Sequence, residues 1–291
     1  MKKSTLEKKI QISNDIMFYI YTHIDTDINI DELSDDLKIS KFYMQKIFKE
    51  IFGRNIYESI KSIRLQKASN LLLTNKYSTI TEIANACGYA SQTSFIRAFK
   101  GRFDMTPKEW RKGGYKEYSN AIVKQSDQKK DSLRDYNFLE PEIVKMQDIS
   151  AYYIRHRGYN QAIKQTWQKI QTWAYNHDLK EYQLIALLHD NPTITPLDEC
   201  HYVASIVDTK KQIKTDHRLP KFTISGGVYA KFEVDGKEGD FLNFLQWVYH
   251  EWLPQSDYET TTKPPFAIYK TNEYLSSDIT FALEFYLSIA Y

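Results

Sequence analysis

Two short stretches of the chain carry side chains suited to contact with the edges of DNA bases, at corresponding positions. The base-reading candidates are Phe42, Gln45, Lys46, Gln92, Thr93, Ile96 and Arg97. In the major groove, Arg and Lys can bond guanine and Gln can bond adenine. We therefore expect double-stranded DNA to be the partner of these residues.

Hydroxyl and basic residues flank these candidates and are suited to hold phosphates. They are Ser40, Lys41, Lys49, Ser91, Lys100 and Arg102. Phosphate contacts fix the register of a protein on the duplex without reading its sequence. The alternative is that both stretches are ordinary solvated helix faces, and their recurrence in two units favours DNA contact.

The elements that must position these side chains are two helix-turn-helix units. Such a unit needs a small residue where its helices cross, a tight turn, and a capped second helix with one apolar face. Ser34 and Ala84 are the small residues, Ser40 and Ser91 are the expected caps, and Gly88 permits the second turn. The expected buried stripes of the second helices are Met44, Ile47 and Phe48, and Phe95, Ala98 and Phe99.

A long helix is predicted between the two units, from Asn55 to about Thr74. Glu58 has the capping-box spacing from Asn55. The apolar residues of this helix predict a spacer that packs against both units: Ile56, Ile60, Ile63, Leu65 and Leu72. Arg64 is predicted to be a buried ion-pair partner rather than a DNA contact.

The second unit carries a specific pattern. The run from Ile80 to Pro107 reads Ile-x-x-Ile-Ala-x-x-x-Gly-Tyr and continues with Ser91, Phe95, Arg97, Phe99, Lys100, Phe103 and Thr106. With its looser first copy, roughly residues 10 to 115, it resembles the AraC/XylS family of regulators. The resemblance implies seven helices, a monomer with two recognition helices in successive major grooves, and activation of transcription with RNA polymerase as a partner. Lys38 stands where many members have glycine, and Phe42 where Trp is common.

The charge distribution separates a basic front from an acidic rear. Through residue 120 there are 20 Lys and Arg against 14 Asp and Glu, and after it 19 against 23. A polyanion is therefore expected to meet only the front. The stretch 116–137 has little apolar content and no helical periodicity. We predict a DNA-binding domain at 1–115, a linker at 116–137 and a second domain at 138–291.

The front is predicted to be all-α and the rear α+β. In the rear, a strand, an amphipathic helix and two strands appear twice, at Ala151–Asp208 and Val228–Tyr291. Two such strand-helix-strand-strand repeats can pair about a pseudo-dyad. The concave seam between them would suit a small ligand.

Four segments of the rear carry a second resemblance. They are Leu184 to Pro192, Glu251 to Pro254, Pro265 to Tyr269 and Glu284 to Ile289. Together they resemble the GyrI-like effector-binding domain over about residues 138–291. The resemblance implies a pocket for a small amphipathic or cationic ligand, with aromatic walls around an acid. The candidates are Tyr152, Tyr229, Trp247, Tyr269 and Glu284. Ala267 stands where many members have an acidic residue, which weakens the case for a cation.

Catalysis and metal binding are not predicted. The sequence has no nucleophile elbow, HExxH, Walker or dinucleotide fingerprint, and Cys87 and Cys200 have no partner at metal-ligand spacing. We expect no cofactor, no metal, no catalytic residue and no enzyme activity. His156 is predicted to be solvated, and His189 to belong to a strand-end turn.

No apolar run is long enough to span a membrane, and the N-terminus has no signal-peptide core. A cytoplasmic protein with no membrane partner is expected.

Two other functions stay open beside a ligand-responsive activator. One is a binding protein that sequesters a toxic small molecule or protein and uses its DNA reader only to control its own expression. The other is a small-molecule hydrolase. An activator predicts that ligand changes promoter output, a sequestering protein that the rear domain protects cells without DNA, and a hydrolase that ligand is consumed.

Overall fold

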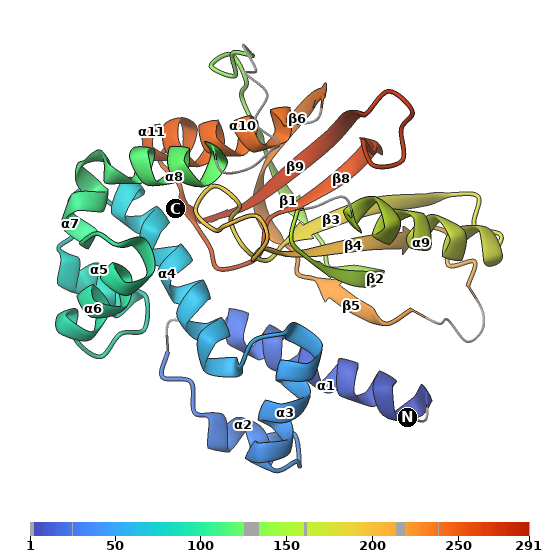
Figure 1. Cartoon of the computed structure of the whole chain (residues 1–291), viewed down its shortest axis with the longest axis horizontal. Coiled ribbons are helices and arrows are strands. Elements are labelled where there is room, and N and C mark those ends of the chain that lie inside the picture. Colours follow the sequence, from blue (N-terminus) through green and yellow to red (C-terminus); the bar gives the residue numbers. More distant parts are fainter. Residues whose placement is uncertain are drawn as a thin grey trace. The chain divides into compact units, whose positions relative to one another are not determined.

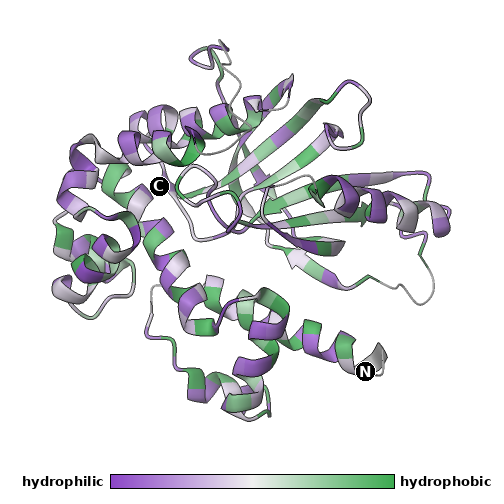
Figure 2. Ribbon diagram, in the orientation of Figure 1, coloured by the Kyte–Doolittle hydropathy of each residue, from purple (hydrophilic) through white to green (hydrophobic). Residues whose placement is uncertain are grey.

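The computed structural model describes residues 3–24, 26–124, 134–159, 162–213, 219–237 and 239–290 (Figure 1). The chain divides into two compact units, Met1–Lys112 and Gly113–Tyr291. Figure 2 shows apolar segments along the strands of the second unit and on one side of many helices. Each unit has a hydrophobic core of its own.

The first unit is helical in the part of the chain described. Its helices are α1 (Lys3–Thr22), α2 (Ile30–Asp36), α3 (Lys41–Phe52), α4 (Ile56–Thr74), α5 (Ile80–Ala86), α6 (Gln92–Phe103) and α7 (Pro107–Glu109), followed by a π-helical turn, η1 (Trp110–Gly114). α2 and α3 form one helix-turn-helix unit, α5 and α6 form the other, and α4 joins them. The predicted all-α front is confirmed.

Side-chain caps determine where the long helices begin. The hydroxyls of Ser40 and Ser91 each accept a hydrogen bond from the backbone N–H three residues on. Asn55 and Glu58 form the capping box of α4, with both bonds at 2.8 Å. A cap of this kind contributes about 1 kcal/mol. All three predicted helix starts are confirmed.

The buried stripes of α3 and α6 fix which side of each helix faces outward. Met44, Ile47 and Phe48 are buried, as are Phe95 and Phe99, whereas Ala98 is half-buried. The five predicted apolar residues of α4 are all buried. Since each large apolar side chain contributes roughly 1.5–3 kcal/mol on burial, these contacts hold both second helices in place.

The turns of the two helix-turn-helix units both contain a residue with positive φ, but the residue types differ. Lys38 has a φ of +54° and Gly88 a φ of +72°. A Cβ at Gly88 would lie 2.7 Å from Nη2 of Arg64 and 2.8 Å from the carbonyl oxygen of Ile24. Gly88 is therefore required by both conformation and space. Lys38 adopts a conformation that costs about 1–2 kcal/mol for a residue with a Cβ.

The second unit is α+β, as predicted. Its elements are α8 (Tyr115–Lys124), β1 (Glu142–Met146), β2 (Ile149–Arg157), α9 (Ala162–Asn176), β3 (Tyr182–Leu188), β4 (His201–Asp208), β5 (Lys221–Ile224), β6 (Gly227–Lys237), α10 (Asp240–Trp247), the π-helical turn η2 (Val248–Trp252), α11 (Leu253–Gln255), β7 (Glu259–Thr260), β8 (Phe266–Thr271) and β9 (Thr280–Ala290). Within the described residues, the strands form a sheet in the order β1-β6-β9-β8-β3-β4-β2-β5, with β7 paired to β9.

Two copies of a strand-helix-strand-strand unit build this sheet, which confirms the predicted repeats. The first is β2-α9-β3-β4 and the second β6-α10-β8-β9, and they meet where β3 pairs with β8 and Ala186 lies opposite Ala267. The edge strands are exchanged. β1 precedes β2 but pairs with β6, and β5 precedes β6 but pairs with β2.

The two faces of the sheet differ. On one, which we call the helix-covered face, alternate strand residues such as Tyr202 and Phe285 pack with Trp167 of α9 and Phe244 of α10. The residues between them point to the opposite face, because side chains alternate along a strand. This alternation decides which predicted ligand residues can meet.

Residues 116–137 were predicted to lack helical structure. This prediction is wrong for the first part of that stretch, because residues 115–124 form α8. Tyr115, Ser119 and Val123 make a buried stripe at four-residue spacing. A serine in that stripe weakened its apolar pattern in the sequence. Residues 125–133 of the predicted linker lie outside the described residues, and the domain limits 1–115 and 138–291 stay predictions.

Candidate functional site

The outer face of α3 presents the first group of base-reading candidates. Phe42 is 80% exposed, Lys46 is exposed and Gln45 is half-buried. An exposed aromatic ring on a helix whose other face is fully packed has no role in the core. The geometry leaves these side chains available to a partner.

The outer face of α6 presents the second group at corresponding positions. Gln92, Thr93 and Arg97 are exposed, and Ile96 is half-buried. The hydroxyl of Thr81 in α5 donates to Oε1 of Gln92 at 3.2 Å, which ties the first turn of α6 to α5. The two second helices thus expose the same positions.

The phosphate candidates differ in how freely their polar groups can reach a ligand. Lys49 and Lys100 are exposed, and Arg102 is half-buried with its guanidinium 5.5 Å from the ring of Phe103. Lys41 forms an ion pair with Asp31 at 2.8 Å, and hydrogen bonding to Asp31 raises the pKa of Lys41. The hydroxyls of Ser40 and Ser91 already accept bonds as helix caps.

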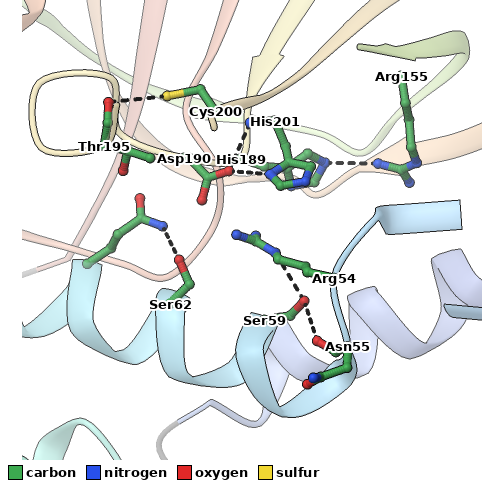
Figure 3. Close-up of polar contacts among 11 residues, drawn as sticks. Arg54, Asn55, Ser59, Ser62, Arg155, His189, Asp190, Thr195, Cys200 and His201 are labelled. Atoms are coloured by element: carbon green, nitrogen blue, oxygen red, sulfur yellow. Dashed lines mark hydrogen bonds and ion pairs between the residues drawn. The ribbon is translucent and has the colours of Figure 1, made fainter. Parts of the chain in front are cut away.

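Arg64 and Arg54 support the backbone of the first unit. Arg64 donates to the carbonyl oxygens of Ile24 and Thr26 at 3.0 and 2.7 Å. Arg54 donates to the hydroxyl of Ser59 at 3.2 Å beside the α4 cap (Figure 3). Both contacts are structural.

The predicted ligand residues are not brought together, because they lie on both faces of the sheet. Tyr152 and Tyr269 belong to the helix-covered face, where Tyr152 contacts Trp173 at 4.8 Å. Trp247, at the end of α10, donates to Oδ1 of Asn137 at 3.2 Å. Tyr229 and Glu284 lie on the opposite face, where the Tyr229 hydroxyl donates to the carbonyl oxygen of Ser225 at 2.6 Å.

Glu284 already has partners for its charge. Although partial burial opposes ionisation, hydrogen bonds from Tyr286 and Lys270 hold the pKa of the Glu284 carboxyl below its usual value. The Tyr286 hydroxyl donates at 2.7 Å, and Nζ of Lys270 lies 3.3 Å away. Lys270 also pairs with Glu233 at 3.0 Å. This carboxylate is therefore a member of a charge network on the surface of the sheet.

A cavity of about 70 Å³ lies between the two repeats. Its lining comes from both: Tyr159, Pro192 and Leu197 from the first, and Lys237, Gly239, Phe241, Leu242, Leu245, Glu273, Tyr274, Ile279 and Phe281 from the second. The cavity is walled by aromatic and aliphatic groups with one carboxylate, Glu273, and one lysine, Lys237. The position of the cavity matches the predicted seam, although none of the predicted ligand residues is among those that line it.

Glu273 acts electrostatically on a buried tyrosine pair. The hydroxyls of Tyr202 and Tyr269 lie 3.5 Å apart, and Nε1 of Trp167 donates to Tyr202 at 3.0 Å. Burial raises the pKa of both tyrosines, and the negative charge of Glu273 raises it further. Through this pair Tyr269 is linked to the acid of the cavity.

Polar residues close the loop between β3 and β4. Oδ2 of Asp190 accepts the backbone N–H of His201 at 2.9 Å and lies 2.7 Å from Nδ1 of the same residue. Arg155 lies 3.3 Å from Nε2 of His189, and the Cys200 thiol donates to the carbonyl oxygen of Thr195 (Figure 3). The Asp190 bonds join the two ends of the loop, which is a structural role.

His156 differs from its prediction as a solvated side chain. It is half-buried, and its Nδ1 lies 3.2 Å from the hydroxyl of Thr166 on α9.

Among the described residues, no cluster of three or more His, Cys, Asp or Glu side chains could hold a metal ion. Within the same residues, no helix is long and apolar enough to cross a membrane.

Comparison with known proteins identifies both units. Residues 139–290 match the GyrI-like small molecule binding domain, and residues 33–113 match a helix-turn-helix domain. The xylose operon regulatory protein of Escherichia coli K12 is 40% identical over 95 residues, 33% of this chain and 24% of that protein. The chain thus spans about a quarter of that relative.

Two shorter relatives are covered more fully. The regulatory protein SoxS of Escherichia coli K12 is 35% identical over 101 residues, 35% of this chain and 94% of SoxS. The transcriptional regulator Rob of Salmonella typhimurium is 23% identical over 260 residues, 84% of each chain, so that match runs through both units. All three relatives are named as regulators. The chain therefore belongs to the AraC family of DNA-binding transcription regulators and carries a C-terminal GyrI-like small-molecule binding domain.

Proposed function

We propose that the protein is a sequence-specific transcription activator whose output is changed by a small amphipathic cation bound in its second unit. The observation that supports this most strongly is the matched exposure of α3 and α6. In each helix a buried stripe leaves the same positions on the outer face, with Lys46 and Arg97 equivalent. A monomer in the cytoplasm, with RNA polymerase as its partner at promoters, fits this arrangement.

Base readout is assigned to seven side chains of the two outer faces. Lys46 and Arg97 are suited to guanine, Gln45 to adenine, and Phe42 to a thymine methyl group. Gln92, Thr93 and Ile96 complete the second face. Phosphate contact is assigned to Ser40, Lys41, Lys49, Ser91, Lys100 and Arg102, among which Lys41 must share its charge with Asp31.

The ligand is assigned to the seam cavity, with Glu273 as its acid in place of Glu284. Phe241, Phe281 and Tyr274 offer contacts to a ring, and the Glu273 carboxylate can pair with an ammonium group. The cavity of about 70 Å³ is smaller than the ~150 Å³ apolar cavity that holds benzene. A ligand with a ring must therefore displace wall side chains or extend into solvent.

Benzylamine and benzyl alcohol test this assignment, because they share a ring and differ in charge. In the full chain, Glu273→Gln should weaken benzylamine binding about tenfold, near 1.4 kcal/mol, and leave benzyl alcohol binding unchanged. Glu284→Gln is the matched control and should change neither affinity. Calorimetry at constant ionic strength gives both values. Equal loss of both compounds in Glu273→Gln, or selective loss of benzylamine in Glu284→Gln, would return the acid to another position.

A further inference from the structure

We propose that α8 couples the seam cavity to the DNA-binding unit. The inference rests on the proposed ligand site and adds the route by which ligand binding reaches the reader. Two observations support it. The helical segment that walls the cavity also packs against α8, and only four residues separate α8 from a core residue of the first unit.

α8 packs along α10 and η2 in antiparallel register. The ring of Tyr115 meets the ring of His250 at 5.0 Å, and Nε2 of Gln246 donates to the Ser119 hydroxyl at 2.9 Å. Tyr115 and Ser119 are four residues apart, as are Gln246 and His250, so successive turns of the two helices match. Ser119 is fully buried and His250 is 8% exposed.

An exposed ion pair adds to this packing. Nζ of Lys116 lies 2.8 Å from Oε1 of Glu251. Both side chains are about half exposed, so screening by solvent limits the contribution of this pair. The buried contacts of Tyr115 and Ser119 therefore hold α8 in place.

The same continuous helical segment forms one wall of the cavity. Phe241, Leu242 and Leu245 of α10 line it, whereas Gln246 and His250 face α8. Beyond Trp247 the segment continues as the π-helical turn η2, which contains His250 and Glu251. Such turns are irregular and occur often at functional sites. A displacement of α10 at the cavity must be taken up at the α8 contact.

The chain connection from α8 to the reader is short. Trp110 is 1% exposed, and its ring contacts Phe103 and Phe99 of α6 at 4.6 and 5.6 Å. Its Nε1 donates to the carbonyl oxygen of Ser69 in α4 at 3.1 Å. Only residues 111–114 separate this core residue from Tyr115, and Gly113 has a φ of +116° that suits glycine. A movement of α8 therefore pulls on a chain that reaches Trp110 through only four residues, and Trp110 packs against the second recognition helix α6.

Ligand size supplies the driving force for this movement. A ring seated wholly inside the cavity of about 70 Å³ must displace the wall, so the bound and free states then differ in the position of the wall. A ligand shifts an equilibrium only when it binds two states with different affinity. The wall contributed by α10 provides that difference.

The coupling through α8 is tested in the full chain, with the cavity filled either by a compound or by a larger side chain. Benzylamine fills it from solution, and Leu242→Phe or Leu245→Phe fills it with a ring from α10. Each should change affinity for a selected DNA site about fivefold or more. Two glycines inserted between Gly113 and Gly114 should abolish that change while leaving affinity without ligand and the benzylamine-induced rise in Tm intact. The same insertion between Lys210 and Lys211, in an exposed turn, is the control and should preserve the change.

Two results would overturn the role of α8. One is a full change in DNA affinity in the Gly113–Gly114 insertion variant. The other is unchanged DNA affinity in a folded Leu242→Phe or Leu245→Phe protein. A wild-type protein whose Tm is unmoved by benzylamine would instead refute the ligand site, and the two filled-cavity variants would still decide the coupling through α8.

Discussion

At the scale of single residues, Arg97 and Lys49 separate reading from anchoring. Arg97 lies on the outer face of α6, whereas Lys49 lies in the last turn of α3, and both are exposed. Arg97→Ala should lose about 1–3 kcal/mol of binding to the preferred site and relax preference at one base pair. Lys49→Ala should weaken all DNA similarly and make the salt slope shallower by about one.

Anisotropy titrations on cognate and scrambled duplexes at several salt concentrations give both quantities. If Arg97→Ala bound both duplexes with unchanged affinity, the assignment of α6 as a reader would be wrong.

The two turns predict opposite stability effects at equivalent positions. Lys38→Gly should raise the free energy of unfolding by up to about 1 kcal/mol, because glycine accepts a φ of +54° without strain. Gly88→Ala should lower it by more than about 1 kcal/mol, since a Cβ there would meet Arg64 and the Ile24 carbonyl group. Urea denaturation monitors both. Lys38→Asn serves as a control for the lost charge, and a destabilised Lys38→Gly or a neutral Gly88→Ala would contradict this account of the turns.

Residue patterns predicted the exposed faces of α3 and α6 better than the residues that line the cavity. The exposure of Phe42, Lys46 and Arg97 follows from local helical spacing, so one sequence sufficed. Glu284 was predicted as the acid of the ligand site because it interrupts an apolar strand. Its partner Lys270 comes from the neighbouring strand β8, and a pattern within one strand does not show such cross-strand pairing. Glu273 lies in a connection between strands, where a polar residue is ordinary.

At the scale of elements, the α8 contact predicts a pH dependence of stability. Burial, and then the charge of Lys116, lowers the pKa of His250 to about 4. The unfolded histidine, with a pKa near 6.5, takes up a proton between about pH 6.5 and 4 that the folded one does not. This contribution to stability is fully present above about pH 6.5 and is lost as the pH falls through that window, at up to about 1.4 kcal/mol per unit.

His250→Gln should make the fall in unfolding free energy between pH 6.5 and 4.5 shallower than in the wild type. Urea denaturation of the full chain across this range measures the difference, with other titrating groups common to both proteins. An equal slope in the two proteins would mean that His250 is not held neutral against α8.

The predicted helices α3, α4 and α6 have a clear sequence pattern in their own residues, whereas the missed helix α8 does not. The helices α3, α4 and α6 carry caps and apolar stripes in their own residues. α8 carries a serine in its stripe, and that serine accepts a hydrogen bond from Gln246, far along the chain. Likewise the exchange of β1 and β5 between repeats depends on long-range pairing that no local pattern records.

For the whole molecule, the sequence repeats predicted a helical first part and an α+β second part. The basic front contains two copies of a helix-turn-helix unit, and the acidic rear contains two copies of a strand-helix-strand-strand unit. In each part, the two copies together form a feature that a single copy cannot form. Two readers, as proposed, would double the length of DNA sequence recognised, and two sheet halves create a seam between them.

One chain should read DNA with both α3 and α6, and a hydroxyl-radical footprint shows whether it does. The full chain would be bound to a site selected from a random-sequence pool, with stoichiometry measured in parallel. One protein per site should protect two regions on one face of the duplex, with centres about 34 Å apart and no palindrome. Protection confined to a single groove, or a symmetric site that binds two chains, would contradict the two-reader account.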